Sequence, residues 1–289
     1  MKKSITIGDK TVGPGNPCFI SAEIGINHNG SLETTFALID IAISAGCDSV
    51  KFQKRTIETV YTVEELATPR ESVFGDTNGD LKRGLEFSAD DYAKIDDYCK
   101  SEEIMWYASP WDEASVEFLE QFSPPTHKIA SASLTDDSLL KTIRETGRPV
   151  LLSTGMSSLE EIDHAVDVLG TDDLLLYHCT STYPGVNEEL NLDVIPALQE
   201  RYGIPIGYSG HEVGVASSVV AAALGACAVE RHITTSRALW GSDQAASLEP
   251  DGIRRLVRDI RLIPVWRGDG EKRVYDSEVP IREKLRRVG

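Results

Sequence analysis

This chain of 289 residues is short of cysteine, of basic residues and of long apolar runs, and each shortage excludes a class of protein. Its five cysteines are widely spaced, with no Cys-x-x-Cys pair, which indicates reduced thiols and not a disulfide framework. Lys and Arg number 29 against 46 Asp and Glu, a net charge of −17, which argues against binding nucleic acid or an anionic membrane. No stretch is long enough to span a bilayer, and the N-terminus has no apolar signal region. We therefore expect a cytoplasmic protein.

Two further absences bear on the fold. No internal repeat is visible, and no Gly-x-Gly-x-x-Gly follows the first expected strand, which ends at Glu23. The hydrophobic fraction of 41% is ordinary for a globular protein with a large core. The length exceeds the usual single domain, but α/β barrels commonly run to about 250 residues as one domain.

The most informative feature is where the polar residues fall. Eight short apolar runs each end in a charged or hydroxylated residue or in a histidine. These residues are Glu23, Lys51 with Gln53, Ser109, Lys128 with Ser131, Ser153, His178, Ser209 with His211, and Glu230 with His232. In a closed (β/α)₈ barrel the C-terminal strand ends share one face, so these side chains would converge on one pocket. An open doubly wound sheet is the alternative fold, but it would lack eight strand-end polar sites.

Helical patterns alternate with these apolar runs. They cover residues 32–45, 88–100, 112–121, 136–145, 158–169, 190–202, 213–224 and 250–264, and Ser31 is a plausible N-cap of the first. Strands separated by such helices predict a parallel sheet, which right-handed crossovers can close into a TIM barrel. Residues 4–16 predict a short N-terminal β-hairpin that could plug one end of the barrel.

Two segments do not follow the alternation. Residues 54–88 are rich in Glu, Thr and Gly, and a connection of that length is usually functional or disordered. The last residues, from Gly268 onward, are polar and weakly periodic. We therefore expect a catalytic barrel over residues 1–268 and an extended tail or linker over residues 269–289.

Two histidines are the candidate metal ligands. His211 and His232 end adjacent strands of the predicted barrel, so their imidazoles could meet one divalent ion such as Mn²⁺, Fe²⁺, Co²⁺ or Zn²⁺. Two protein ligands would leave open positions for water and substrate. The alternative is that each is an ordinary core or loop histidine, but two on neighbouring strand ends favour a metal.

Lysines on two other strands are the candidate anion binders. Lys51 and Lys128 could grip a phosphate or carboxylate together with nearby serine hydroxyls, despite the overall negative charge. Lys128 could instead be a Schiff-base nucleophile. Glu23 fits a general acid/base or, equally well, a structural partner of these lysines. Asp243 could bind sugar hydroxyls or simply belong to a turn.

Several motifs, taken in order, resemble the sialic acid synthase (NeuB-like) family over residues 17–268. They are Ser21-Ala22-Glu23-Ile24-Gly25-Ile26-Asn27-His28-Asn29-Gly30, Val50-Lys51-Phe52-Gln53, Lys128-Ile129-Ala130-Ser131, Leu152-Ser153-Thr154-Gly155-Met156, His178-Cys179-Thr180-Ser181-Thr182-Tyr183-Pro184, Tyr208-Ser209-Gly210-His211, Glu230-Arg231-His232-Ile233-Thr234 and Ser247-Leu248-Glu249-Pro250. The resemblance implies a TIM-barrel transferase that condenses phosphoenolpyruvate with an open-chain aldose. The products would be a 2-keto-3-deoxy sugar acid and phosphate.

The resemblance also implies roles for individual residues. His211 and His232 would hold a divalent metal, Mn²⁺ in the first place with Mg²⁺ or Co²⁺ as alternatives, and Glu23 would be the acid/base. The residues implied for phosphoenolpyruvate are Lys51, Lys128, Ser109, Ser131, Ser153, Ser181 and Ser209, and those implied for the sugar are Gln53, Tyr183 and Asp243.

Three departures from the family pattern concern the sugar half of the reaction. Ser133 stands where members acting on N-acetylmannosamine typically have Glu, and Gly241-Ser242-Asp243 replaces the usual Gly-Pro-Asp, followed by Gln244. The sequence stops at Gly289, where family members continue into a small antifreeze-like (SAF) domain that reaches a dimer partner's active site. We therefore expect the same reaction on an N-acetylmannosamine-like or related aldose, and a homodimer through barrel contacts. The alternatives are a Schiff-base aldolase using Lys128 and a non-catalytic phosphoenolpyruvate-binding homologue.

Overall fold

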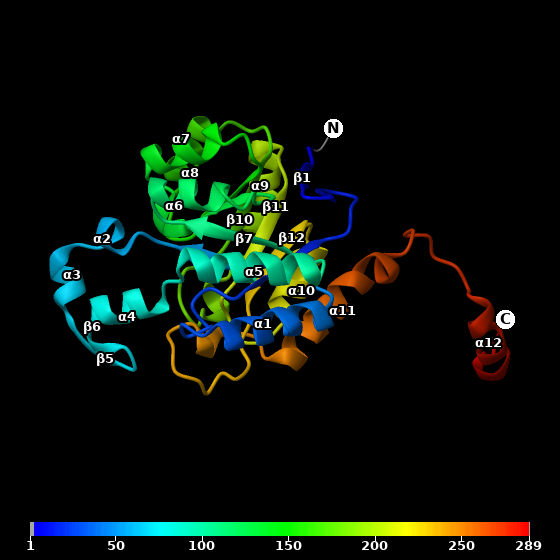
Figure 1. Cartoon of the computed structure of the whole chain (residues 1–289). Coiled ribbons are helices and arrows are strands. Elements are labelled where there is room, and N and C mark those ends of the chain that lie inside the picture. The colour runs from blue at the N-terminus through cyan, green and yellow to red at the C-terminus, as the bar shows by residue number, and fades with distance from the viewer. Residues whose placement is uncertain (1–2, 289) are drawn as a thin grey trace.

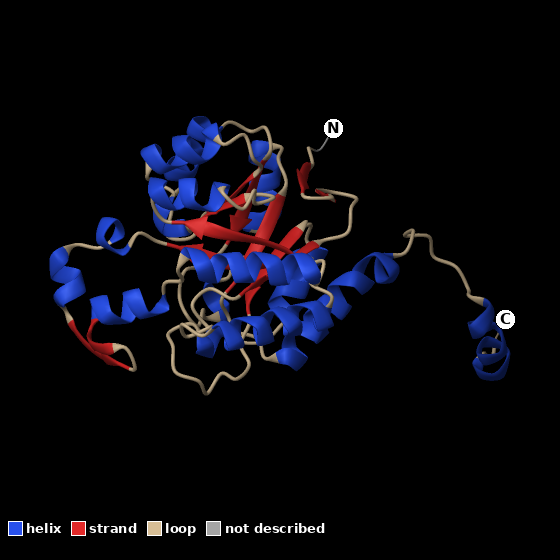
Figure 2. Cartoon of the chain, in the orientation of Figure 1, coloured by secondary structure: helices blue, strands red, loops and turns tan. Residues whose placement is uncertain are grey.

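Eight parallel strands ringed by helices form the body of the protein in a computed structural model that describes residues 3–288 (Figure 1, Figure 2). Residues 1–2, at the start of the predicted barrel region, and residue 289, at the end of the predicted tail, lie outside the described residues. The strands are β3 (Phe19–Glu23), β4 (Ser49–Lys54), β7 (Met105–Pro110), β8 (His127–Ile129), β9 (Val150–Ser153), β10 (Leu174–His178), β11 (Ile206–Gly210) and β12 (Ala228–His232). Their order is β7-β4-β3-β12-β11-β10-β9-β8, and β7 packs beside β8, so the sheet curls into the predicted TIM barrel.

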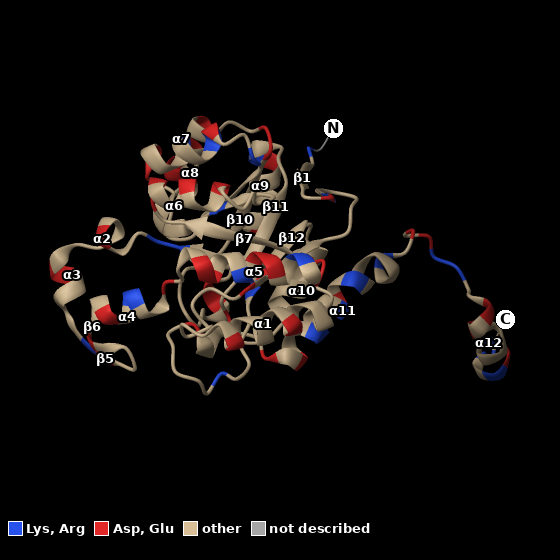
Figure 3. Ribbon diagram, in the orientation of Figure 1, with Lys and Arg blue, Asp and Glu red and all other residues tan. Residues whose placement is uncertain are grey.

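A helix follows each barrel strand and covers the outside of the sheet. These helices are α1 (Leu32–Ala45), α5 (Ala89–Ser101), α6 (Glu113–Glu120), α7 (Asp137–Glu145), α8 (Leu159–Leu169), α9 (Val194–Tyr202), α10 (Ala216–Ala223) and α11 (Pro250–Arg267). Local chemistry starts several of them: Ser31 caps α1 as predicted, and Ser88 and Ser158 form capping boxes at α5 and α8. These helices carry most of the charged residues of the barrel, while the strands carry few (Figure 3). No helix in the described part of the chain is long and apolar enough to cross a membrane.

The interior of the barrel changes character from one end to the other. Its N-terminal half is apolar, with Phe19, Leu151 and Leu175 fully or almost fully buried. The hairpin of β1 (Ile5–Ile7) and β2 (Lys10–Val12) packs its apolar side chains against this layer and closes the barrel from below, as the sequence predicted. Side chains alternate in direction along a strand, so every second residue points into the barrel. Near the C-terminal ends of the strands these inward residues are polar, and the polar layer therefore faces the C-terminal opening.

The long connection after β4 is a folded insert and not an irregular loop. It contains α2 (Ile57–Val60), α3 (Val63–Ala67), the hairpin of β5 (Pro69–Ser72) with β6 (Gly75–Thr77), and α4 (Asn78–Leu85). The insert projects from one side of the barrel (Figure 1). The sequence pattern predicted only its length, because elements of three to eight residues are too short to establish a hydrophobic period.

The C-terminal segment departs from the prediction in two ways. Helix α11 continues past Pro264 to Arg267, and the expected extended tail contains a 3₁₀ turn (Asp276–Glu278) and a further helix, α12 (Val279–Leu285). Pro280 lies in the first turn of α12, where proline fits a helix because the amide there needs no partner. Helix α12 lies away from the barrel (Figure 1).

Candidate active site

One cavity at the C-terminal end of the barrel collects nearly all the residues singled out above. It has a volume of about 220 Å³ and is lined by every predicted site residue except Asp243. Lys51, Lys128, His211 and His232 lie in it together, so the convergence expected of a closed barrel is confirmed.

Glu23 and Lys51 form a buried ion pair on one side of this cavity. The Nζ of Lys51 lies 2.7 Å from the Oε2 of Glu23 and donates a hydrogen bond of 3.2 Å to Ser109. The amide of Gln53 donates to the other carboxylate oxygen of Glu23 at 3.2 Å. Burial raises the pKa of Glu23 to about 7, against the opposing effect of Lys51 and with a further increase from Glu230. Glu23 is therefore a partner of Lys51 that can also exchange a proton near neutral pH.

Lys128 faces Lys51 across the cavity with partners of its own. Its Nζ donates to Ser153 at 2.6 Å, lies 3.4 Å from the carboxylate of Glu230 and sits 5.0 Å from the centre of the Tyr177 ring. Burial lowers the pKa of Lys128. Two ammonium groups, Lys51 and Lys128, therefore face two carboxyl groups, Glu23 and Glu230, in this cavity.

Glu230 is a site residue that the sequence interpretation did not assign a role. Burial raises the pKa of its carboxyl, but the ammonium groups of Lys128 and Lys51 lower it by more, to about 2. Its Oε1 also accepts a hydrogen bond from Ser209 at 3.1 Å. The signal was available, because Glu230 precedes His232 by two positions on β12 and therefore faces the same side of the sheet.

The two histidines fit a shared metal ion. Their ring centres lie 5.6 Å apart, a separation that accommodates an ion with metal–nitrogen bonds of roughly 2.1 Å. The Nδ1 of His211 donates to the carbonyl of Thr180 at 2.8 Å, which leaves its Nε2 lone pair for a ligand, 3.0 Å from the hydroxyl of Tyr183. The buried Nδ1 of His232 has no hydrogen-bond partner among residues 3–288. Burial lowers the pKa of both imidazoles, that of His211 to about 4, so both are neutral as ligation requires.

The protein groups around the two histidines do not complete the coordination sphere of a metal ion. No cluster of three or more His, Cys, Asp and Glu in metal-binding geometry occurs within residues 3–288. The Oδ2 of Asp243 lies 3.8 Å from the Nδ1 of His232. A metal held by His211 and His232 would therefore keep most of its positions for water and substrate.

The hydroxyl groups of Ser131, Ser153 and Ser181 gather in another part of the cavity lining. The backbone amide of Gly155 donates to the Oγ of Ser131 at 3.0 Å. A Cβ at position 155 would lie 2.9 Å from that hydroxyl and would collide with Ser181. Glycine at this position therefore leaves room for several hydroxyl and amide donors around one small anion, with Ser153 and Lys128 beside them.

Four other residues discussed from the sequence lie outside the cavity. The side chain of Asp243 is 16% exposed at the rim, beside His232. Gln244 is buried, where its side chain accepts a hydrogen bond from Thr234 and supports the loop after β12. His178 bonds the carbonyl of Leu190 at 2.7 Å, and Ser133 is buried in the 3₁₀ turn after β8. These contacts give Gln244 and His178 structural functions.

Behind the histidine pair, a third buried ion pair joins β12 to the segment that follows β11. Arg231, fully buried, donates to Glu212 at 3.0 Å and to Ser218 at 2.9 Å. Tyr208 donates to the other oxygen of Glu212 at 2.9 Å. Because Glu212 follows His211 and Arg231 precedes His232, this contact ties the two imidazole-bearing segments together.

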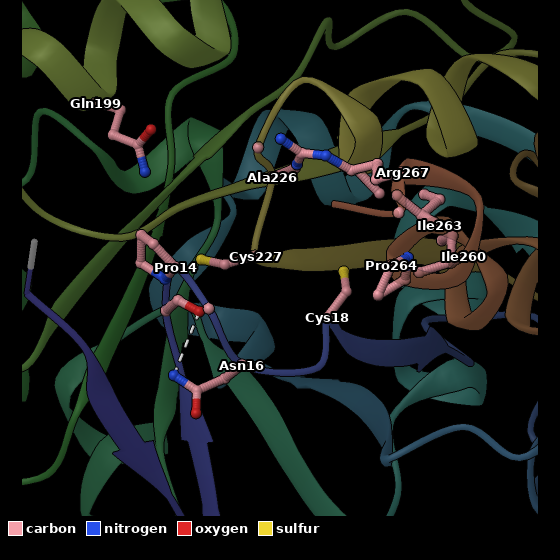
Figure 4. A pocket seen from close by; sticks show the side chains of 15 residues that line it. Pro14, Asn16, Cys18, Gln199, Ala226, Cys227, Ile260, Ile263, Pro264 and Arg267 are labelled. Atoms are coloured by element: carbon pink, nitrogen blue, oxygen red, sulfur yellow. Dashed lines mark hydrogen bonds between the residues drawn. The ribbon is translucent and has the colours of Figure 1, made fainter. Parts of the chain in front are cut away.

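A separate cavity of about 490 Å³ lies at the opposite, N-terminal end of the barrel (Figure 4). It is lined by the thiols of Cys18 and Cys227, by apolar residues of α11 and by Arg267. Burial raises the pKa of both thiols, that of Cys227 to about 12, so they are unreactive. This cavity contains none of the predicted site residues.

Comparison with known proteins agrees with this arrangement. Residues 38–272 match the NeuB family model. The chain is 40% identical to the N-acetylneuraminate-9-phosphate synthase of Homo sapiens, covering 95% of this chain and 78% of that protein. It is 34% identical to the N,N'-diacetyllegionaminic acid synthase of Legionella pneumophila, covering 97% and 82%. The crystal structure of an N-acetylneuraminic acid (sialic acid) synthetase from Leptospira borgpetersenii matches with a TM-score of 0.84 and 31% identity, covering 100% of this chain and 99% of that chain.

The match covers most of the chain, and the barrel contains the buried polar site expected of such an enzyme. The chain belongs to the NeuB family. It is a phosphoenolpyruvate-dependent sugar acid synthase, a carbon–carbon bond-forming transferase of a family that typically uses a divalent metal.

Proposed function

We propose that this enzyme condenses phosphoenolpyruvate with an open-chain aldose related to N-acetylmannosamine, giving a sialic-acid-like 2-keto-3-deoxy sugar acid and inorganic phosphate. The observation that carries the proposal is the meeting of Lys51, Lys128 and a neutral histidine pair in one cavity. Two cations suit a doubly charged anion, and a metal site beside them suits an aldehyde.

Phosphoenolpyruvate would bind between the two lysines. Lys128 and the hydroxyls of Ser131, Ser153 and Ser181 would take the phosphate, because hydrogen bonds from charged donors are the strong ones. Lys51 and Ser109, 3.2 Å apart, would take the carboxylate. Each group then has a cation and at least one hydroxyl, and the enol carbon is held facing the histidine pair.

Glu23 would act on the enol carbon that bears the phosphate. When the methylene carbon of phosphoenolpyruvate attacks the aldehyde, positive charge develops at that centre, and the ionised carboxylate of Glu23 stabilises it. Glu23 then accepts a proton from the water that adds there. Cleavage of the carbon–oxygen bond releases phosphate. A pKa of about 7 suits this double use near neutral pH.

A divalent ion on His211 and His232 would polarise the carbonyl oxygen of the aldose. We propose Mn²⁺ in this position, with Mg²⁺ or Co²⁺ as alternatives. Gln53, Tyr183 and Asp243 would contact the sugar chain, since the first two line the cavity beside Glu23 and His211, and Asp243 stands at its rim. The identity of the aldose, a homodimer and the division into a barrel and a tail remain predictions.

The Schiff-base aldolase is the second candidate, because burial lowers the pKa of Lys128 as such chemistry requires. The ion pair of Lys128 with Glu230 counts against it, since that pair keeps the ammonium charged. Borohydride treatment in the presence of a keto acid would trap a covalent adduct on an aldolase. We expect no adduct here and loss of activity on treatment with EDTA.

The central experiment measures phosphate release by the purified protein with Mn²⁺, phosphoenolpyruvate and a panel of aldoses. We expect release that depends on both the aldose and the metal, with a new keto acid formed in equal amount. Failure of every aldose to stimulate release would refute the condensing reaction and leave a phosphoenolpyruvate-binding homologue. Lys128→Met should raise the KM for phosphoenolpyruvate by roughly 10- to 100-fold, the value of a charged hydrogen bond, while Lys141→Met on the exposed face of α7 should not.

A further inference from the structure

The two lysines of the active site are held by different partners. The Nζ of Lys51 lies 2.7 Å from the carboxylate of Glu23, which makes a close ion pair. Among the described residues, the carboxylate nearest to the Nζ of Lys128 is that of Glu230, and it lies 3.4 Å away. Lys128 is therefore the less neutralised of the two lysines, although both are buried.

The face of an aromatic ring lies beside the ammonium group of Lys128. Tyr177 points into the barrel from β10 and is completely buried, and its ring centre is 5.0 Å from the Nζ of Lys128. Its hydroxyl has no hydrogen-bond partner within residues 3–288, whereas buried tyrosine hydroxyls usually have one. The ring, and not the hydroxyl, is therefore the part of Tyr177 that contacts a polar group in this structure.

A glycine on the neighbouring strand makes room for this ring. Gly207 on β11 is the register partner of Tyr177 on β10. A Cβ at position 207 would lie 2.7 Å from the Cε1 and 2.8 Å from the Cδ1 of the tyrosine ring, closer than side-chain atoms pack. Glycine in a strand interior weakens the strand and often marks a close approach to its backbone. Here the group that approaches is the ring of Tyr177.

Such a ring stabilises a buried ammonium group without adding a negative charge. The face of an aromatic ring attracts a cation within about 6 Å of its centre, and more strongly where water is excluded. Burial lowers the pKa of Lys128, against the opposing effect of Glu230, so the charged form of this lysine needs support. A second carboxylate would supply that support but would also repel the phosphate of phosphoenolpyruvate. An aromatic ring avoids the repulsion.

We propose that Tyr177 is a positioning residue for Lys128: its ring, packed against Gly207, keeps the ammonium group charged and available to the phosphate of phosphoenolpyruvate. The inference rests on the proposed function, since it concerns the lysine to which that function assigns the phosphate. Tyr177 does not line the active-site cavity, so it acts through Lys128 and not by contact with the substrate.

The surroundings of the two lysines determine which of them loses its proton first as the pH rises. The titratable and charged groups that face Lys128 are Glu230, Lys51, Glu23, Cys179, His211 and Tyr177. Burial opposes the charge on Lys51 as well, but Glu23 and Glu230 raise its pKa by more, so the net shift is upward. Lys128, whose pKa is lowered, therefore deprotonates at the lower pH. The alkaline limb of kcat/KM for phosphoenolpyruvate should report on Lys128.

The test compares Tyr177→Phe, which keeps the ring, with Tyr177→Leu, which keeps only apolar volume. Carbon-13 NMR of protein labelled in its lysine side chains follows the titration of Lys128, and the signal lost in Lys128→Met identifies it. We expect Tyr177→Leu to lower the midpoint of this titration by about one pH unit, a tenfold change in proton binding, and Tyr177→Phe to leave it unchanged. The alkaline limb of kcat/KM for phosphoenolpyruvate, measured with Mn²⁺ and an accepted aldose, should move to lower pH by the same amount.

Two further variants separate this contact from general packing. Phe19→Leu removes another ring from the same apolar layer of the barrel and should leave the titration of Lys128 unchanged. Gly207→Ala displaces the ring of Tyr177, so it should lower the midpoint in the same direction as Tyr177→Leu, and it provides the test if that variant does not fold. Circular dichroism checks that each variant is folded.

An unchanged titration in folded Tyr177→Leu, or an equal change in Tyr177→Phe, would overturn the role of the ring and leave the condensing reaction standing. A loss of activity in Tyr177→Leu that is the same at every pH would also overturn it, because such a loss indicates a structural role only. If no aldose makes the parent enzyme consume phosphoenolpyruvate, the proposed function fails, while the NMR titration still decides whether Tyr177 keeps Lys128 charged.

Discussion

Arg231 and Glu212 form an ion pair of 3.0 Å that is almost completely buried and links the two strands ending in the histidine pair. The pair lies on the helix-facing side of the barrel wall, since Arg231 alternates with the inward-facing Glu230 and His232. Arg231 also donates to the backbone carbonyls of Glu212 and Gly214. It therefore fixes the loop that begins at His211 relative to β12.

Weakening the contact between Arg231 and Glu212 should lower the affinity for the metal ion, although neither residue is a proposed metal ligand. Glu212→Gln keeps the size of the side chain and some of its hydrogen bonds but removes the charge opposite Arg231. We expect Mn²⁺ affinity to fall by roughly 10-fold or more, as is usual for groups that support metal ligands. Titration calorimetry measures the affinity, and circular dichroism checks that the variant is folded. A folded variant with unchanged affinity would show that the pair serves stability alone.

The assignment of the histidines as metal ligands has a direct test. His211→Ala and His232→Ala should each abolish retention of the divalent ion, because one remaining imidazole cannot hold it. Elemental analysis after dialysis against metal-free buffer measures the bound metal. His164→Ala is the control, because His164 is exposed on α8 and contacts Asp137 at 2.8 Å. Metal content equal to that of the parent protein in either active-site variant would refute the assignment.

Gly25 provides a test of how tightly Glu23 is placed. Its φ is +54°, and a methyl group there would lie 2.9 Å from the carboxylate of Glu23. Gly25→Ala should therefore lower kcat by about 10- to 100-fold, because small displacements of a reacting group are costly. Both this variant and Gly203→Ala should lose about 1–2 kcal/mol of stability from the left-handed backbone.

Gly203→Ala separates the two effects. Gly203 has a φ of +64°, nothing lies within 4 Å of its added Cβ, and it ends α9 far from the cavity. We expect its kcat to equal that of the parent enzyme. Similar activity in the two variants would mean that Glu23 tolerates displacement and is not held for catalysis.

Asp112 joins the barrel to the insert and should make stability depend on pH. Its carboxylate caps α6 by accepting from the amide of Ser115 at 2.8 Å, and it accepts from the amide of Thr56 at 2.7 Å. Burial raises the pKa of Asp112, but these hydrogen bonds lower it by more, so its net shift is downward. A lowered pKa contributes stability that is present above the unfolded value of about 3.9 and is lost as pH falls through the folded value.

Asp112→Ala should reduce the free energy of unfolding at pH 7 by about 1–2 kcal/mol, the typical cost of losing a cap. The difference from the parent protein should shrink as the pH is lowered below about 4. Urea unfolding at several pH values measures both effects. Asp136→Ala is the control: it removes the cap of α7, a bond of 3.1 Å to Leu139, without a link to the insert. Equal losses in both variants at every pH would contradict the tethering role of Asp112.

The sequence predicted the barrel and most of the cavity lining for one physical reason. In parallel strands the side chains alternate in direction, and all the strands present their C-terminal ends on one face. Polar residues such as Lys51, Lys128 and His232 at those ends therefore had to meet once the sheet closed. The same rule placed Glu230, two positions before His232, in this group, although it assigned Glu230 no chemical role.

Other features followed no local rule. The helices and hairpin of residues 54–88 are too short for periodicity to reveal, and α12 carries little apolar pattern to distinguish it from a tail. The pairing of side chains could not be predicted either. Nothing in the order of residues indicates that Lys51 pairs with Glu23 and Lys128 with Glu230, and not Lys51 with Glu230 and Lys128 with Glu23.

By itself, then, the order of residues determined which strands would form, which of their faces would be polar, and which functional groups would share one end of the barrel. Those properties depend on neighbours a few positions apart and on the fixed geometry of parallel strands. Only the tertiary structure decided that Glu23 is buried enough for its pKa to reach about 7, and that Arg55 stacks on Trp111. Burial and ion pairing depend on contacts between segments distant in sequence, and those contacts exist only once the chain has folded.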